Sequence, residues 1–180
     1  CGTTPEHLAQ VVAAIDGMAP LSRKPDVSSA VASIYTSCPL AFDKLNMQPP
    51  LIVGERTNTN GSRKFKELLE LSDLDGMVRM AREQEKEGAH ILDVCTAYVG
   101  RDESADMEAF LKRLNTELNI PIMVDSTEYG VLEKALQLIA GRAIVNSINL
   151  EDGESKMMEK VRLISRYGAA AVALTIDEDG

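Results

Sequence analysis

The 180-residue sequence has no tryptophan, only 4% aromatic residues and three cysteines. With so few aromatic side chains, the core must be built from Val, Ile, Leu, Ala and Met. The cysteines Cys1, Cys38 and Cys95 form neither a disulfide framework nor a Cys-x-x-Cys pair, so we expect a reducing, cytoplasmic location. No apolar run approaches the roughly 20 residues that span a bilayer, which argues against a transmembrane protein.

Positive charge is also scarce, and the net charge is −9. An acidic chain repels nucleic-acid phosphates and anionic lipids, so the sequence predicts no nucleic-acid partner and no membrane surface. The first residues include no initiator methionine and no signal-peptide pattern. We therefore expect a chain that begins within a longer sequence or has been processed.

Three regions differ in pattern. Residues 1–18 contain a helix predicted over 5–16, whose apolar side chains share one face. Residues 19–49 are rich in proline and serine and show no sustained period, which predicts a linker with a short strand at 31–35. Residues 50–180 have the regular alternation of a folded domain.

In that third region, short apolar runs alternate with helical patterns. The predicted strands cover 51–55, 90–94, 121–127, 142–150 and 169–177, and the helix predicted over 62–87 breaks near 72–76. Apolar strands alternating with helices indicate an α/β fold with a parallel sheet, either doubly wound or a (β/α)8 barrel. Because a barrel typically needs about 250 residues, a barrel here would be incomplete, with about five βα units.

Polar side chains follow the predicted strands where each one ends. Glu55 and Asn58 follow the first strand, and Asp93, Asp125 and Asn146 close the next three. The carboxyl ends of parallel strands gather binding groups, so these side chains predict a pocket for a polar heteroaromatic ligand. The alternative is that each of them caps a helix or closes a turn.

The loop after the first strand reads Gly61-Ser62-Arg63. Ser62 can cap the helix that follows, and free amides at a helix N-terminus attract anions, so the loop could hold a ligand carboxylate. An ordinary cap on a solvated helix explains the same residues.

Five segments in this order resemble the pterin-binding domain of the cobalamin-dependent methionine synthases. They read VGERTNTNGSRKFKELL (53–69), EGAHILDV (87–94), IPIMVDSTEYGVLEKAL (120–136), GRAIVNSINLEDGE (141–154) and YGAAAVALTIDEDG (167–180). The opening CGTTPEHL resembles the end of the homocysteine-binding domain of the same enzymes, where a Cys-Cys-Gly-Thr-Thr-Pro sequence supplies zinc ligands.

The resemblance implies a (β/α)8 barrel of the dihydropteroate-synthase-like kind that binds 5-methyltetrahydrofolate. It implies transfer of the methyl group to cob(I)alamin on another module of the enzyme, and then to zinc-bound homocysteine. The residues that it marks are Asp125 and Asn146 as catalytic and pterin-binding, Gly61, Ser62 and Arg63 as the folate-contacting loop, Glu55, Asn58 and Asp93 as supporting binding residues, and Cys1 as a zinc ligand.

Two departures from the family pattern lead us to expect no methyltransferase activity from these 180 residues alone. A further pterin-binding Asp lies on a later strand of the family's barrel, and zinc needs three cysteines where only Cys1 is present. The alternatives are a dihydropteroate-synthase-like enzyme, a corrinoid-protein methyltransferase and a non-catalytic folate-binding or scaffolding module. The CGTTPEHL segment argues against the first two.

Overall fold

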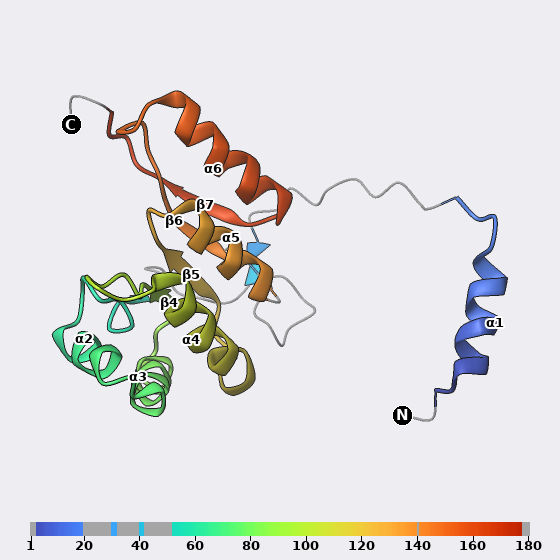
Figure 1. Ribbon diagram of the computed structural model, residues 1–180, viewed down its shortest axis with the longest axis horizontal. Helices are drawn as coiled ribbons and strands as arrows, with labels where there is room; N and C mark the ends of the chain where they lie inside the picture. Colours follow the sequence, from blue (N-terminus) through green and yellow to red (C-terminus); the bar gives the residue numbers. More distant parts are fainter. Residues whose placement is uncertain (1–2, 20–29, 32–39, 42–51, 140, 178–180) are drawn as a thin grey trace.

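Five parallel strands form one open sheet in which the spatial order follows the chain, β3-β4-β5-β6-β7 (Figure 1). The computed structural model describes residues 3–19, 30–31, 40–41, 52–139 and 141–177. The strands are β3 (Val53–Gly54), β4 (Ile91–Val94), β5 (Ile122–Asp125), β6 (Ile144–Ile148) and β7 (Ala170–Ala173). A doubly wound sheet reverses its strand order, whereas a barrel adds each strand beside the last. The order found here confirms the incomplete barrel.

Helices connect these strands, and their ends follow local rules. They are α2 (Arg63–Glu70), α3 (Leu74–Lys86), α4 (Glu103–Glu117), α5 (Tyr129–Leu138) and α6 (Glu154–Arg166). The side chains of Ser62, Asp73 and Asp102 each accept a backbone N–H at the start of a helix. The predicted break near 72–76 is confirmed, since Ser72 between α2 and α3 has a φ of 54°.

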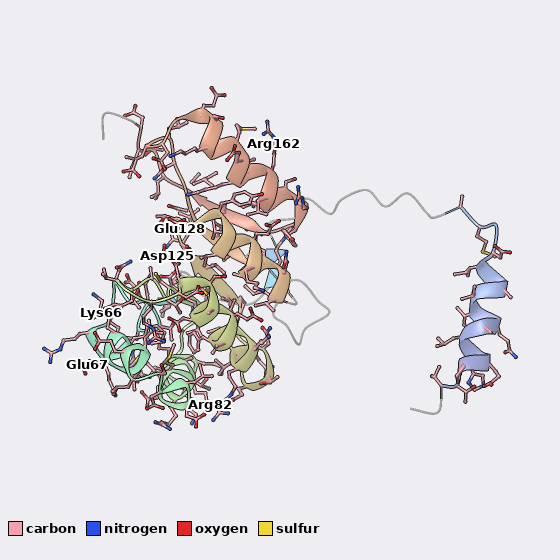
Figure 2. The ribbon with its side chains drawn as sticks, in the orientation of Figure 1. Lys66, Glu67, Arg82, Asp125, Glu128 and Arg162 are labelled. Carbon is pink, nitrogen blue, oxygen red and sulfur yellow. The ribbon has the colours of Figure 1, made fainter. Side chains whose placement is uncertain are left out.

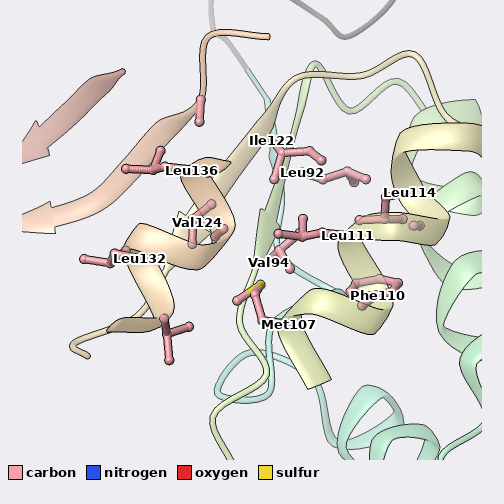
Figure 3. Close-up of a cluster of buried hydrophobic side chains, with 14 of the residues drawn as sticks. Leu92, Val94, Met107, Phe110, Leu111, Leu114, Ile122, Val124, Leu132 and Leu136 are labelled. Atoms are coloured by element: carbon pink, nitrogen blue, oxygen red, sulfur yellow. The ribbon is translucent and has the colours of Figure 1, made fainter. Parts of the chain in front are cut away.

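The two faces of the sheet carry alternate residues of each strand. Leu92, Val94 and Val124 face the helices and join the main apolar core (Figure 3). Ile91, Met123 and Ile144 form a smaller cluster. Because side chains alternate along a strand, the residue two positions after each of these three belongs to that second face. Those residues are Asp93, Asp125 and Asn146.

The main core lies between the sheet and its helices and includes the inner face of α4. Met107, Phe110 and Leu111 are fully buried there, and the ring of Phe110 meets the ring of Phe65 at a centroid distance of 5.4 Å. This contact ties α2 to α4, and thereby fixes the loop that leaves β3.

The N-terminal part of the chain contains a helix and a small ladder. The predicted helix is confirmed as α1 (Pro5–Ile15), and none of its residues is buried. The strand β1 (Ala30–Val31) pairs antiparallel with β2 (Leu40–Ala41). The strand predicted at 31–35 overlaps β1 only at Val31, because 32–39 lie outside the described residues, and β2 was not predicted.

Among the described helices, none has the combination of length and apolar composition needed to cross a bilayer.

We expect Phe110→Ala to lower the free energy of unfolding by about 3–5 kcal/mol, because the substitution leaves a cavity under α4 and removes the contact with Phe65. Urea denaturation followed by circular dichroism measures the change. Leu71→Ala is the control, since Leu71 is 78% exposed and its truncation should cost less than about 0.5 kcal/mol. Equal effects of the two substitutions would contradict this assignment of the core.

Candidate functional site

The loop between β3 and α2 is fastened to the end of β4 by two threonines. Thr57 Oγ1 donates to the carbonyl of Asp93 at 2.8 Å, and Thr59 Oγ1 donates to the carbonyl of Ala97 at 2.8 Å. Both threonines are fully buried. Asn58, between them, forms an isolated parallel bridge with Cys95. The loop therefore continues the pairing of β3 with β4, which holds Asn58 against the end of the sheet.

Asn58 joins two carboxylates from neighbouring strands. Its Nδ2 donates to Asp93 Oδ2 at 2.6 Å and to Asp125 Oδ2 at 2.7 Å. Charge-assisted bonds of this length are strong, so the three side chains form one rigid group. The structure thus brings together three of the residues that the sequence placed at separate strand ends.

Asp93 is the most deeply buried acid of the group, at 3% exposure. Burial raises the pKa of its carboxyl, and the negative charges of Asp125 and Glu55 raise it further, while hydrogen bonds from Asn58 and Asn146 oppose the rise. Its Oδ1 atom nonetheless has no hydrogen-bond partner of good geometry among the described residues. A buried acceptor without a donor is costly, so this atom is suited to accept an N–H from a ligand.

Asp125 and Asn146 lie directly opposite each other in the parallel register of β5 and β6. Asp125 closes β5, the middle strand of the sheet (Figure 2). Both side chains are partly exposed and occupy the same face as Asp93. The peptide bond between Asn146 and Ser147 is cis, and the register with β7 shifts between Asn146 and Ile148.

Glu55 and Gly61 lie beside each other in the β3–α2 loop. A Cβ on Gly61 would come within 2.8 Å of Glu55 Cγ and 3.0 Å of the Glu55 carbonyl oxygen, so any other residue there would force Glu55 to move. Both residues line a cleft of about 360 Å³ along β3, together with Gln84 and Glu87. Neither Asp93, Asp125 nor Asn146 lines this cleft.

Ser62 and Arg63 behave in this structure as an ordinary helix start. Ser62 Oγ accepts from the N–H of Phe65 at 3.2 Å, while the side chain of Arg63 is 92% exposed and pairs with Glu67 at 3.0 Å. Their contact with a ligand stays a prediction. Cys1 lies outside the described residues, and so does its predicted zinc role.

Two polar side chains that the sequence analysis overlooked also support the site. Gln84 is 3% exposed, accepts the N–H of Arg56 at 2.7 Å and donates to Thr57 at 3.3 Å. Glu103 accepts from Ser126 at 2.6 Å. A signal for Gln84 was present, because it falls on the apolar face of α3 at helical spacing from Met77.

The described residues contain no group of three or more His, Cys, Asp or Glu that could hold a metal ion. The side chains that do converge are amides and two carboxylates, and the carboxylate oxygens are acceptors that suit a ligand with ring N–H groups.

Residues 54–180 match the family model of the pterin binding enzymes. The chain belongs to this family. The orphaned acceptor of Asp93 and the neighbouring Asp125 fit a pterin ring, which presents N–H donors along one edge. Asp93, Asp125 and Asn146 lie on the face of the sheet opposite the main apolar core.

Among curated proteins, the chain is 44% identical over 183 residues to methionine synthase from Mycobacterium tuberculosis, and 44% identical over 190 residues to that from Mycobacterium leprae. Each match covers all of this chain and 15% of the relative, so the chain spans about one seventh of their length. Among solved structures, a dihydropteroate synthase from Clostridium difficile, determined in the presence of pteroic acid, matches with a TM-score of 0.50. It is 23% identical over 68% of this chain and 47% of that chain, which shows a shared fold.

We expect Asp93→Asn to stabilise the chain at neutral pH. Because the pKa of Asp93 is raised, the folded state binds this proton more tightly than the unfolded state, whose value is about 3.9. The free energy of unfolding therefore falls as the pH rises from about 3.9 through the raised pKa of the folded state. Above that pKa, the buried negative charge of Asp93 destabilises the folded chain. The substitution removes that cost while its amide oxygen can still accept from Asn58.

Urea unfolding between pH 4 and pH 8 measures the difference between the two proteins. It should be largest at pH 7–8 and shrink towards pH 4. Asp16→Asn, at an exposed position beyond α1, is the control and should show no such trend. A difference that does not vary with pH would mean that Asp93 titrates as an ordinary aspartate.

Proposed function

We propose that this chain is part of a methionine synthase and provides a large share of its 5-methyltetrahydrofolate site. The proposal rests on one observation: Asp125 and Asn146 lie opposite each other on one face of the sheet, beside a buried carboxylate with an unpaired oxygen. The 44% identity to methionine synthases along the whole chain supports this activity over that of other pterin enzymes.

In this proposal, the carboxylates recognise the pterin ring by its N–H groups. Asp125 is partly exposed and already fixed by Asn58, so it can accept from the ring without reorganising. The unpaired Oδ1 of Asp93 lies deeper and is available as a second acceptor. Acceptors that are held in place before binding lose little entropy when the ligand arrives, which favours affinity and orientation.

Asn146 acts on the reacting nitrogen. A neutral tertiary amine holds its methyl group firmly, and protonation of N5 turns tetrahydrofolate into a competent leaving group. The carbon–nitrogen bond then breaks with its electron pair going to N5. The Asn146 amide can present its oxygen to the N5 proton only after protonation, so it stabilises the transition state more than the ground state.

The proposed reaction also needs two partners that other parts of the enzyme would bind. Cob(I)alamin on another module of the enzyme is the proposed methyl acceptor, and homocysteine on zinc is the final one. Cys1 is a proposed ligand of that zinc ion. A cytoplasmic location is part of the same proposal, in keeping with the free, buried thiol of Cys95.

We expect Asn146→Ala to lower the rate of methyl transfer by about 100-fold, the usual loss when one transition-state hydrogen bond is removed. Binding of methyltetrahydrofolate should change by less than about threefold, because the amide oxygen acts only after protonation. Single-turnover transfer to cob(I)alamin and calorimetric titration separate the two quantities in the longer enzyme that carries this segment. A parallel loss of both quantities would assign Asn146 to ground-state binding, and an unchanged rate would refute the proposal.

We expect Asp125→Asn to weaken binding of methyltetrahydrofolate by about 10- to 100-fold, since a charged acceptor is replaced by an amide that can turn a donor towards the ring. Calorimetry on the longer enzyme measures the change. Asp152→Asn is the matched control, because Asp152 is exposed and its ion pair with Lys156 lies at the start of α6. Full affinity in Asp125→Asn would place the folate elsewhere.

A further inference from the structure

The side chain of Asn58 has no donor left for a ligand. An asparagine amide has two N–H hydrogens and one oxygen. Nδ2 donates to Asp93 and to Asp125, and Oδ1 accepts the backbone N–H of Asn60 at 2.7 Å. With 2% exposure, the residue has no open surface either. A ligand could use the Asn58 amide as a donor only by breaking one of these bonds.

The backbone of Asn58 is committed as well. Its N–H donates to the carbonyl of Glu55 at 3.1 Å, and its own carbonyl accepts from Gly61 at 3.1 Å and from Ser62 at 2.9 Å. The loop from Glu55 to Ser62 is thus folded around this one residue. The amide cannot rotate away from the two carboxylates without disturbing the start of α2.

We infer that Asn58 is a positioning residue, which holds Asp93 and Asp125 together as a pair of acceptors for one edge of the ligand. The inference rests on the proposed function, because the acceptors matter only if they bind the ring. Asn58 acts through the two carboxylates and does not contact the ligand.

The charges around the pair explain why such a bridge is needed. Asp93 faces Asp125 from β5 and Glu55 from the end of β3, with the neutral Asn146 amide from β6 on the same side. The thiol of Cys95, whose pKa is raised by burial, also senses Asp125. Two like-charged carboxylates without a shared donor tend to retain one proton between them. A protonated carboxyl presents its O–H towards an N–H of the ring. Two donors then face each other, and the hydrogen bond that recognises the ring is lost.

Asn58→Asp tests this inference, since it keeps the shape of the side chain and removes both donors. In the longer enzyme, we expect the affinity for methyltetrahydrofolate to fall about 10- to 100-fold at pH 7. The acidic limb of the binding profile should move to higher pH, because the carboxylates hold their proton longer. Asn58→Ser keeps one donor, so its affinity for methyltetrahydrofolate should lie between that of the unsubstituted enzyme and that of Asn58→Asp. It also provides the test if Asn58→Asp does not fold.

Asn60→Ala is the matched control. Asn60 lies on the same loop and its side chain makes only a 3.9 Å contact with the sulfur of Cys95, so affinity and pH profile should stay unchanged. In an Asp93→Asn background, the loss caused by Asn58→Asp should shrink, because fewer negative charges then need the bridge. Equal losses in both backgrounds, with an unshifted pH profile, would overturn the inference.

A titration without ligand separates this inference from the proposed function. In the 180-residue chain, carboxyl NMR of Asp93 and Asp125 should show a raised pKa in Asn58→Asp or Asn58→Ser. Unchanged carboxyl titrations overturn the positioning role whether or not folate binds. Failure of the unsubstituted longer enzyme to bind methyltetrahydrofolate overturns the proposed function, and with it the purpose assigned to the acceptor pair.

Discussion

Two carboxylates from adjacent strands share one amide, and one of them, Asp93, is buried. This arrangement constrains the structure around it. Desolvation and mutual repulsion both oppose placing Asp93 beside Asp125, so donors must be supplied nearby. The donor comes from Asn58 on a third strand's loop, and Thr57 and Thr59 fasten that loop to β4. The packing of Phe65 on Phe110 fixes the helix that follows. Core stability therefore offsets the cost of placing these two carboxylates side by side.

The sequence predicted the scaffold well because its signals are local. Apolar runs and helical spacing located all five sheet strands, and Gly88 and Gly168, which have positive φ, follow the ends of α3 and α6. The convergence of Asp93, Asp125 and Asn146 also followed from the sequence, since the ends of parallel strands meet at one edge. Strand alternation then places all three on one face.

Contacts across the sheet could not be predicted in this way. Whether Asn58 touches a ligand or bridges two carboxylates depends on how the loop after β3 lies against the ends of β4 and β5, and the periodicity of a single strand does not show this. Likewise, Ser62 and Arg63 fit both an anion-binding loop and an ordinary cap, and only the folded structure shows that Arg63 pairs with Glu67. The support from Gln84 depends on how α3 packs, although its position on the apolar face was a usable signal.

The cleft along β3 and the candidate site are different places, and physical chemistry favours the candidate site as the place of ligand recognition. The 360 Å³ cleft follows β3, which has one sheet neighbour among the described strands, and its exposed Ile52 and Val53 are typical of an unpaired strand edge. Of the polar side chains that line it, Arg56 is already paired with Glu87, and Gln84 already accepts the backbone N–H of Arg56. The face that carries Asp93, Asp125 and Asn146 offers fixed charge, a buried acceptor without a donor and side chains from three strands. Recognition of a ring with several N–H groups requires those properties, and volume alone does not provide them.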